Sequence, residues 1–351
     1  MRYGIIGTGM MGCEHIMNIG LTPGGRVAAI SDPNETSRSW GKSFAGDGVE
    51  VYRDYRDMLR AAPIDAVVVA SPNFTHYDVL QDIFRTNKHI LVEKPLCTQV
   101  DHCHRTIEAG ARRRGIVWVG MEYRFMPSVA HLLEQAGSQA VGYLQMIAIR
   151  EHRFPFLPKV DNWNRFARNT GGTLVEKCCH FFDLMNLLAA QRPQRVFASG
   201  AQDVNHLDER YDGQTPDIID NAFTIVDYDG GIRAMLDLCM FAEGSAHEVE
   251  ITATGSRGKL QAFEPDHIFA LSRRDGSDRE VRTFDLDVSI GTAGAHHGST
   301  YFEHVAFQEA IRNGTKPVVT IEDGALAVAV GAAAEQSIRE HRPVELRELG
   351  F

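Results

Sequence analysis

Residues suited to acid–base chemistry occur at two places in this chain. Glu176, His180 and Asp183 follow one another at intervals of four and three residues, so a helix would place them on one face. Histidine titrates near neutral pH and can take the proton of a hydroxyl group. Lys94, in Glu93-Lys94-Pro95, could stabilise a developing alkoxide charge. We interpret Lys94, His180 and Glu176 as candidate catalytic residues for the oxidation of a secondary alcohol.

Each of these residues also has a plainer interpretation. A lone histidine on a helix is more often structural than catalytic, and a lysine outside such a motif would lie at the surface. Asp183 could hold the ring of His180. Cys178 and Cys179 are interpreted as packed small residues rather than thiol nucleophiles. His102, Cys103 and His104 lack a second ligand pair, so no metal site is predicted; His296 and His297 are assigned to a loop, with substrate contact as the alternative.

A nucleotide-binding pattern opens the chain. A short apolar strand at 3–6 runs into Gly7-Thr8-Gly9-Met10-Met11-Gly12, which is G-x-G-x-x-G ahead of a predicted helix. Gly7 permits the tight turn, Gly9 lets the backbone approach a pyrophosphate, and Gly12 brings the helix close to the strand. The alternative is a structural glycine turn in another type of α/β protein.

The second predicted strand, 26–31, ends at Asp32, twenty residues after Gly12. A carboxylate at that place accepts hydrogen bonds from the adenosine ribose and repels the 2′-phosphate of NADP. The sequence therefore predicts NAD as the cofactor, although Arg38 is near enough in sequence to reach a 2′-phosphate.

Strands and helices continue to alternate through the first third of the chain. Further strands are predicted at 66–70, 89–92 and 116–120, with helices near 77–87 and 99–114. This alternation predicts a doubly wound parallel sheet with its site at the carboxyl ends of the strands. The residues expected to line the cofactor after these strands are Ser71, Asn73, His76, Glu93 and Lys94, with a loop-stabilising role equally open for His76.

The second part of the chain has strands without intervening helices. Strands are predicted at 141–150, 194–200, 221–228, 232–241 and 247–254, and loops at 202–217 and 286–300. The pattern predicts an α+β domain with an open, mostly antiparallel sheet. Such a sheet needs its outer face covered, which favours a homodimer or homotetramer. We expect a nucleotide-binding domain over 1–122 and a substrate-binding and oligomerisation domain over 123–351.

Several segments together resemble the Gfo/Idh/MocA oxidoreductases. They are Gly7-x-Gly9-x-x-Gly12, Ser71-Pro72-Asn73-x-x-His76, Glu93-Lys94-Pro95, Tyr123-Arg124-Phe125, the stretch from Gly171 to Asp183, and the closing segment from Phe302 to Pro317. The resemblance implies a Rossmann domain, an open-sheet domain and hydride transfer from a sugar, sugar derivative or cyclitol to NAD. It also implies that Tyr123, Arg124 and Asp183 contact substrate. Glu176 departs from the aspartate usual in the family.

Composition limits the partners of the protein. The chain has 351 residues, 44% hydrophobic and 23% charged, and a net charge of −10, which argues against binding to nucleic acid or to anionic membranes. No apolar stretch is long enough for a membrane span. The early glycine motif leaves no room for a signal peptide, and six cysteines without a C-x-x-C pair suit a reducing compartment. We therefore expect a cytoplasmic protein.

One segment has the opposite charge. Residues 150–177 hold six basic and three acidic side chains, a net charge of +3. Arg153, Lys159 and Lys177, with His152 as a donor and Trp163 as a stacking surface, could bind a sugar that carries a sulfonate, carboxylate or phosphate. The alternative is a solvated basic edge or a subunit interface.

Three functions fit these observations. The first is an NAD-dependent dehydrogenase for a sugar, sugar derivative or cyclitol. The second is an NAD-dependent glycoside hydrolase, sulfoquinovosidase-like, which oxidises the ring transiently, eliminates the aglycone and reduces the ring again. The third is a non-catalytic NAD-binding regulator. A dehydrogenase accumulates NADH with product, whereas the glycosidase releases aglycone without net NADH.

Overall fold

The computed structural model describes residues 1–351 as two compact units. One unit contains residues 1–122 and 286–325, and the other contains 123–285 and 326–351. The predicted boundary assigned 286–325 to the second domain, whereas the structure places this segment in the first unit. The physical reason is the packing of helix α11 (Ser299–Asn313) on the first unit: Phe307 is fully buried against the rings of Tyr3 and Trp118.

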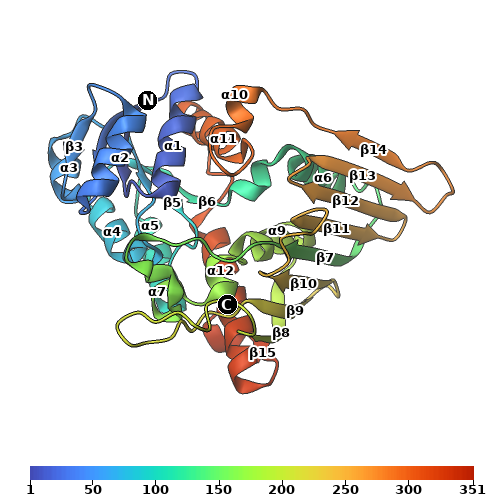
Figure 1. Ribbon diagram of the computed structural model, residues 1–351. Helices are drawn as coiled ribbons and strands as arrows, with labels where there is room; N and C mark the ends of the chain where they lie inside the picture. The colour runs from blue at the N-terminus through green and yellow to red at the C-terminus, as the bar shows by residue number, and fades with distance from the viewer. The chain divides into compact units, whose positions relative to one another are not determined.

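The first unit contains a six-stranded sheet in the order β3-β2-β1-β4-β5-β6, and every recorded strand pair in it is parallel (Figure 1). The strand order reverses between β1 and β4, where the carboxyl ends of the strands leave a crevice for a ligand. This confirms the predicted doubly wound sheet. The strands are β1 (Arg2–Ile6), β2 (Arg26–Ser31), β3 (Glu50–Tyr52), β4 (Ala66–Val69), β5 (His89–Glu93) and β6 (Val117–Gly120).

Helices connect these strands, as buried parallel strands require. β4 is completely buried as Ala-Val-Val-Val, the pattern of a strand covered on both faces. The helices are α1 (Met10–Leu21), α2 (Glu35–Ala45), α3 (Tyr55–Ala61), η1 (Asn73–Thr75), α4 (His76–Ile83), α5 (Val100–Gly110), α10 (Val288–Gly291) and α11; η2 (Glu122–Phe125) and α12 (Ile321–Glu340) run across the unit boundaries.

The second unit contains a nine-stranded sheet in the order β14-β13-β12-β11-β7-β10-β9-β8-β15 (Figure 1). β7 and β10 pair in parallel and the other pairs are antiparallel, which confirms the mostly antiparallel prediction. The strands are β7 (Leu144–His152), β8 (Pro193–Ala201), β9 (Asn221–Tyr228), β10 (Arg233–Cys239), β11 (Val249–Gly255), β12 (Gly258–Glu264), β13 (Ile268–Arg273), β14 (Glu280–Thr283) and β15 (Val344–Glu345).

Helices cover one face of this sheet and leave apolar side chains on the other. Helices α6 (Pro127–Gly137) and α9 (Cys179–Ala189) contact the strands, and alternate residues of β9 are buried. On the opposite face Phe197, Ile225 and Met235 form an exposed row across β8, β9 and β10, because they are paired in register. The remaining short helices are η3 (Val160–Arg165), α7 (Ala167–Thr170), α8 (Thr173–Glu176) and η4 (Leu346–Leu349).

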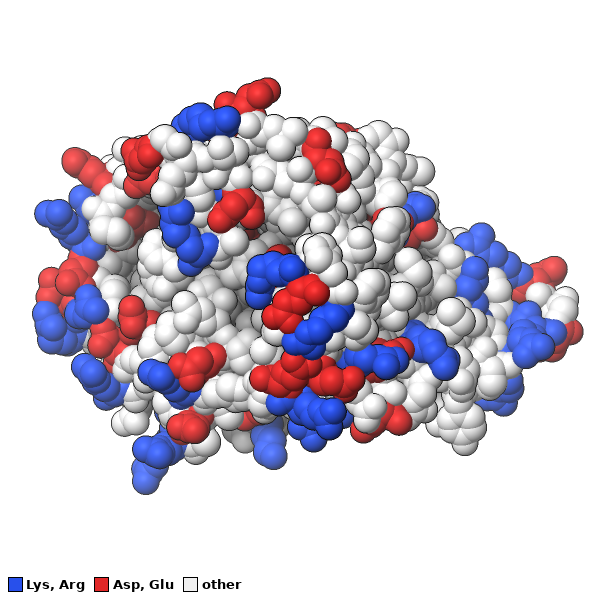
Figure 2. Space-filling model, turned by 90° about the horizontal axis from the view of Figure 1, so that it is seen from below, with Lys and Arg blue, Asp and Glu red and all other residues white.

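Two further features bear on the sequence predictions. The segment 286–300 was predicted as a loop, but it contains α10 and the first two residues of α11. None of the helices combines the length and apolarity needed to cross a lipid bilayer. On the face drawn in Figure 2, acidic and basic side chains are interspersed rather than gathered by sign.

Candidate active site

The turn between β1 and α1 is shaped for a pyrophosphate. Gly7 has a φ of +89°, and a Cβ there would lie 2.6 Å from the carbonyl oxygen of Ala70, so only glycine suits this turn. A Cβ on Gly12 would lie 2.0 Å from the Gly7 carbonyl oxygen, whereas the space beside Gly9 is open. No side chain caps the N-terminus of α1. Its backbone N–H groups therefore suit an anionic ligand.

Asp32 lies beside this turn, as predicted. Its carboxylate accepts hydrogen bonds from the backbone N–H groups of Thr8, at 2.9 Å, and Asn34, at 2.8 Å. The Thr8 hydroxyl donates to the Ser37 carbonyl, so the Thr8 side chain is directed toward α2. Arg38 donates to the carbonyl oxygens of Asp32 and Pro33, which keeps its guanidinium beside the backbone of Asp32. Two methionines of the glycine motif were also expected to line the cofactor. Met10 is exposed and Met11 is half-buried.

The loop after β4 contains one residue suited to the cofactor and one that holds the loop. The Nδ2 of Asn73 is buried and has no hydrogen-bond partner, so a bound cofactor that accepted this hydrogen bond would satisfy it. Ser71 bonds to Thr75 within the loop. His76 is fully buried, with Nδ1 2.8 Å from the Pro95 carbonyl and Nε2 2.9 Å from that of Ser71. These contacts fit the loop-stabilising alternative for His76.

Glu93 is the last residue of β5 and Lys94 follows it. A buried chain of hydrogen bonds ends at Glu93. His304 Nε2 lies 2.9 Å from His15 Nδ1, and His15 Nε2 lies 2.8 Å from Glu93 Oε1. Burial opposes the charge of Glu93, but the hydrogen bond and charge of His15, with the nearby Lys94, hold the pKa of Glu93 below its usual range. The Glu93 carboxylate also accepts the backbone N–H of Lys94.

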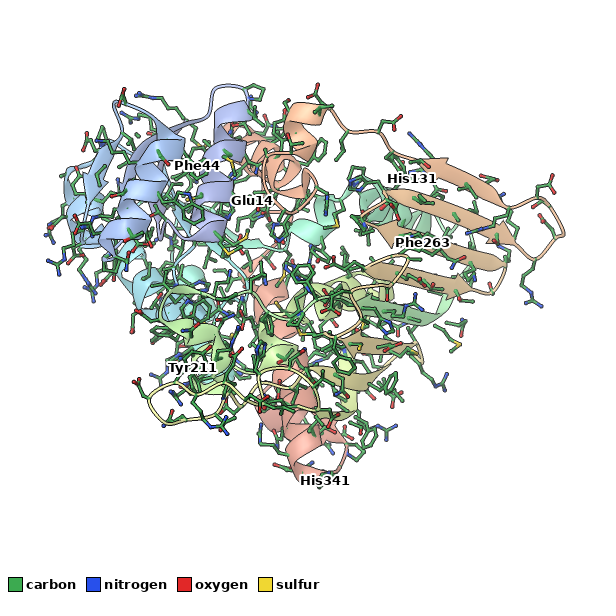
Figure 3. The ribbon with its side chains drawn as sticks, viewed as in Figure 1. Glu14, Phe44, His131, Tyr211, Phe263 and His341 are labelled. Carbon is green, nitrogen blue, oxygen red and sulfur yellow. The ribbon has the colours of Figure 1, made fainter.

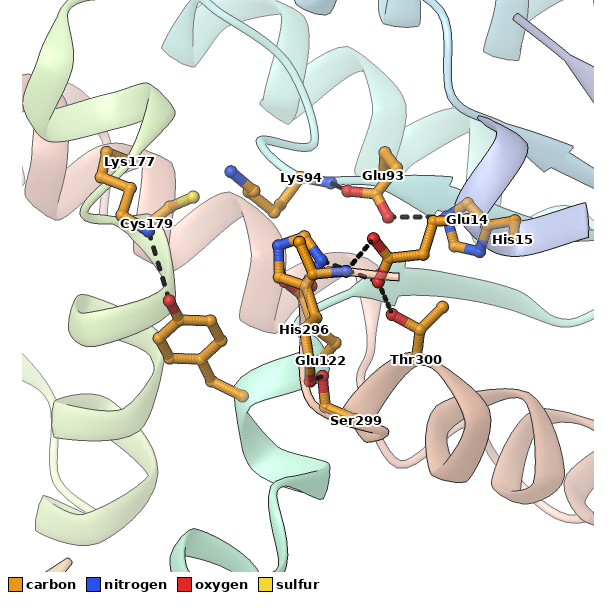
Figure 4. A network of polar contacts seen from close by, with 12 residues as sticks. Glu14, His15, Glu93, Lys94, Glu122, Lys177, Cys179, His296, Ser299 and Thr300 are labelled. Carbon is orange, nitrogen blue, oxygen red and sulfur yellow. Dashed lines mark hydrogen bonds and ion pairs between the residues drawn. The ribbon is translucent and has the colours of Figure 1, made fainter. Parts of the chain in front are cut away.

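A second cluster in this unit surrounds Glu14, which lies on α1 (Figure 3). Its contacts are drawn in Figure 4. Its carboxylate receives His296 Nδ1 at 2.8 Å, the Thr300 hydroxyl at 3.0 Å and the Ala295 N–H at 3.0 Å. Although burial opposes its charge, the bonds from His296, Ala295 and Thr300 lower the pKa of Glu14 to about 2. His296 Nε2 lies 3.6 Å from Glu122, whose pKa is raised by burial. The loop assigned to His296 is thus fixed to α1.

The second unit contains the other candidate catalytic residues on two short helical pieces. α8 ends at Glu176 and α9 begins at Cys179, and both Glu176 and His180 are buried. The segment starts from Gly172, where a Cβ would clash with the Glu335 carboxyl group. Glu335 Oε1 accepts the N–H of Leu174 at 3.0 Å, and burial raises the pKa of Glu335 to about 7.

His180 stacks on Tyr123. The two rings lie 4.4 Å apart between centroids at an angle of 9°. Lys177 donates to the Tyr123 hydroxyl at 3.2 Å (Figure 4) and lies 2.9 Å from Glu151 Oε1. Burial and the Glu151 charge raise the pKa of the Cys178 thiol well above its usual range, which fits a packing role for Cys178.

Asp183 has a charged partner that the sequence did not indicate. Arg124 donates from Nε to Asp183 Oδ2 at 2.6 Å and from Nη2 to Oδ1. Both side chains are buried. Asp183 thus supplies the carboxylate partner that a buried guanidinium needs, and the expectation that it holds the His180 ring stays a prediction.

Most basic side chains of the segment 150–177 form ion pairs with carboxylates of the same chain. Arg150 pairs with Glu250, Arg153 with Glu151 and Glu248, Arg165 with Glu209, and Lys177 with Glu151. His152 also contacts Asp237, at 3.1 Å. Lys159 and Trp163 are half-buried at η3. Carboxylates from outside the segment therefore neutralise much of the +3 charge counted in the sequence.

Sequence reasoning missed the residues that support the site from a distance. Glu14 and His15 stand just after the glycine motif, but nothing local shows that Glu14 contacts the segment before α11 and that His15 contacts Glu93 at the end of β5. Glu151 and Glu335 are likewise ordinary acids in the sequence. Glu14, His15 and Glu151 are buried in the structure, but the sequence carries no signal for this because burial is set by the tertiary fold.

Family comparisons agree with this architecture. Residues 1–121 match the family model described as "Oxidoreductase family, NAD-binding Rossmann fold". Residues 137–346 match "Oxidoreductase family, C-terminal alpha/beta domain". Together these two models cover most of the chain.

Individual proteins are similar over their full length. The myo-inositol 2-dehydrogenase of Thermotoga maritima is 27% identical over 351 residues, 99% of each chain. The scyllo-inositol 2-dehydrogenase (NAD(+)) of Bacillus subtilis is 25% identical over 99% of this chain and 96% of its own. A levoglucosan dehydrogenase solved with NADH and levoglucosan shares the fold, with a TM-score of 0.86, 19% identity and 99% of each chain covered. The chain belongs to the Gfo/Idh/MocA family of NAD-dependent oxidoreductases.

Proposed function

We propose that the protein oxidises a secondary hydroxyl group of a neutral cyclitol or sugar. The observation that carries this proposal is the pairing of the basic segment: Lys177 and Arg153, the cations expected to hold an anionic group, already share Glu151. An uncharged polyol therefore suits this unit better than a sulfosugar does. The names of the full-length relatives, inositol 2-dehydrogenases, agree with this substrate class.

The proposed roles follow from the chemistry of the residues. NAD, when bound, accepts the hydride that leaves the substrate carbon. Gly7, Gly9, Gly12 and Asp32 bind the cofactor. His180 accepts the hydroxyl proton, and Lys94 donates a hydrogen bond to the developing oxyanion.

The other predicted site residues have supporting roles in this proposal. Glu176 accepts hydrogen bonds from the polyol. Tyr123, His152 and Trp163 help to form the substrate face of the second unit, and the Arg124–Asp183 pair fixes its framework.

A panel of cyclitols, neutral sugars, sulfosugars and glycosides, each with NAD, tests the proposal. NADH absorbance at 340 nm and released aglycone are both recorded. We expect NADH in step with ketone from at least one neutral polyol. Aglycone release without net NADH would instead support the glycosidase, and tight NAD binding without any turnover would support the regulator.

We also propose that the protein forms a homo-oligomer through the open face of the second sheet. Phe197, Ile225 and Met235 form an apolar row there, and Phe223 beside them is 64% exposed. A contiguous exposed apolar patch on a sheet favours association with another protein surface. A second copy of the same chain would cover it symmetrically.

A further inference from the structure

Lys177 lies in an unusual place for a lysine, inside the buried segment that holds Glu176 and His180. Its side chain is 9% exposed, and the partner carboxylate of Glu151 is completely buried. A buried ion pair is weak evidence for added stability, because the desolvation of both charges offsets their attraction. Its position next to a candidate base therefore needs a functional explanation.

The contacts of Lys177 lead directly to His180. The Lys177 ammonium donates to the Tyr123 hydroxyl, and the Tyr123 ring lies parallel to the imidazole. The ammonium also lies 5.4 Å from the centroid of the Tyr123 ring. The Tyr123 hydroxyl is thus held by a cation, while the face of its ring covers the imidazole of His180. Phe181 closes the arrangement edge-on, at 5.6 Å from Tyr123.

We propose that Lys177 is a positioning residue for His180, which fixes the imidazole through Tyr123 and places a cation beside it that keeps the ring neutral. This inference rests on the proposed role of His180 as the base. A neutral imidazole has a free lone pair, whereas imidazolium cannot accept a proton. A nearby positive charge disfavours imidazolium, so His180 stays able to accept the substrate proton at lower pH.

The charged groups near His180 determine whether each substitution makes its imidazole easier or harder to protonate. Glu176 and Lys177 precede His180 in the sequence, and Asp183, which is paired with Arg124, follows it. From β7, Glu151 contacts Lys177 and Arg153. Removal of the Lys177 cation should make His180 easier to protonate, and removal of the Glu151 anion should make it harder.

The experiment measures the protonation of His180 directly, without substrate. The imidazole NMR signals of the full-length protein are followed against pH, and the signal lost in His180→Asn identifies the residue. We expect the midpoint of the His180 signal to rise by about 0.5 to 1 pH unit in Lys177→Met, because the variant lacks the cation that is held against the ring stacked on His180. Lys177→Arg should keep the midpoint at its wild-type value, and Glu151→Gln should lower the midpoint. The matched control is Lys259→Met on β12, which should leave the midpoint unchanged.

Opposite shifts separate an electrostatic role from simple damage to the fold. If Lys177→Met and Glu151→Gln move the midpoint in the same direction, or not at all, the inference is overturned. If Lys177→Met does not fold, the Lys177→Arg and Glu151→Gln pair still decides between the two outcomes. Predicted midpoint shifts without turnover of any polyol would instead overturn the proposed function alone.

Kinetics supply the second readout. The acidic limb of kcat/KM should move with the NMR midpoint in each variant, while KM for a neutral polyol changes little. If Lys177 instead bound an anionic substrate group, Lys177→Met would raise KM for acidic sugars only and leave the pH profile in place. That result would contradict the inference.

Discussion

Arg124 donates to both carboxylate oxygens of Asp183, and this ion pair lies in the interior of the second unit. The pair joins η2 to α9. Tyr123 and His180, which stack on each other, are near neighbours of its two members in the sequence. The pair thus fixes the two elements that carry the candidate base and its aromatic cover.

Breaking this pair should destabilise the protein strongly. Arg124→Met leaves the Asp183 carboxylate buried without its cation, which typically costs about 3–5 kcal/mol. Denaturant unfolding of the full-length protein measures the loss. The control is Arg195→Met, which removes an exposed pair with Asp227 and should cost less than about 1 kcal/mol. Equal losses in both variants would contradict the structural role of the Arg124–Asp183 pair.

The sequence was sufficient for the elements whose signal is local. The G-x-G-x-x-G turn, Asp32 at the end of β2 and the apolar β4 each follow from backbone geometry or burial pattern at one place in the chain. The ion-pair partner of Asp183 could not be predicted from a local pattern of this kind. Arg124 is 59 positions away, and only the fold brings it to α9.

Asp32 should determine the choice of cofactor. In Asp32→Ala the carboxylate that repels a 2′-phosphate is lost, while Arg38 still lies beside the backbone of residues 32 and 33. We expect kcat/KM for NAD to fall and that for NADP to rise, each by about tenfold or more, since a change of 1.4 kcal/mol is a factor of ten. Arg38→Met in the Asp32→Ala background should abolish the gain with NADP. An unchanged preference for NAD in Asp32→Ala would refute this role.

Glu335 should make stability depend on pH. Its pKa is raised to about 7 in the folded protein by burial, so the folded state holds a proton that the unfolded state releases. Stability from this group is therefore present below its unfolded pKa and is lost as pH rises through about 7.

Glu335→Gln removes that dependence because the amide does not ionise. Thermal unfolding of both proteins is compared at pH 5 and pH 8. The variant should gain roughly 1 kcal/mol or more relative to the wild type on going to the higher pH. A constant difference between the two proteins would show that Glu335 stays ionised in the folded state.

The segments 150–177 and 286–325 show why two predictions could not be made from the sequence: the pairing of the basic residues and the unit to which 286–325 belongs. Net charge counted along the chain cannot reveal that Glu250, Glu248 and Glu209 pair with basic residues from elsewhere in the sequence. The polar segment 286–300 has no strong helical period, yet Glu14 fixes it through His296 and Thr300. Both outcomes depend on contacts between positions that are far apart in the sequence. The spacing of residues along the chain does not reveal such contacts.

The apolar face of the second sheet provides a test of assembly. Phe223→Lys combined with Ile225→Lys puts two charges in the exposed patch and should convert the oligomer to monomers, because buried unpaired charges oppose association. Light scattering after size-exclusion chromatography measures the mass. Val281→Lys, an exposed change on β14 at the sheet edge, is the control. A monomeric wild type would contradict the proposed assembly.

Direct transfer of hydride from a polyol carbon to the cofactor is the central claim. Carbon-deuterated myo-inositol, or the neutral polyol found active in the panel, is incubated with the protein and NAD, and the reduced cofactor is analysed by mass spectrometry. We predict one deuterium in each NADH and one ketone per NADH, with both lost in His180→Asn and Lys94→Met. Reduced cofactor without deuterium, or product formed without net NADH, would contradict the account.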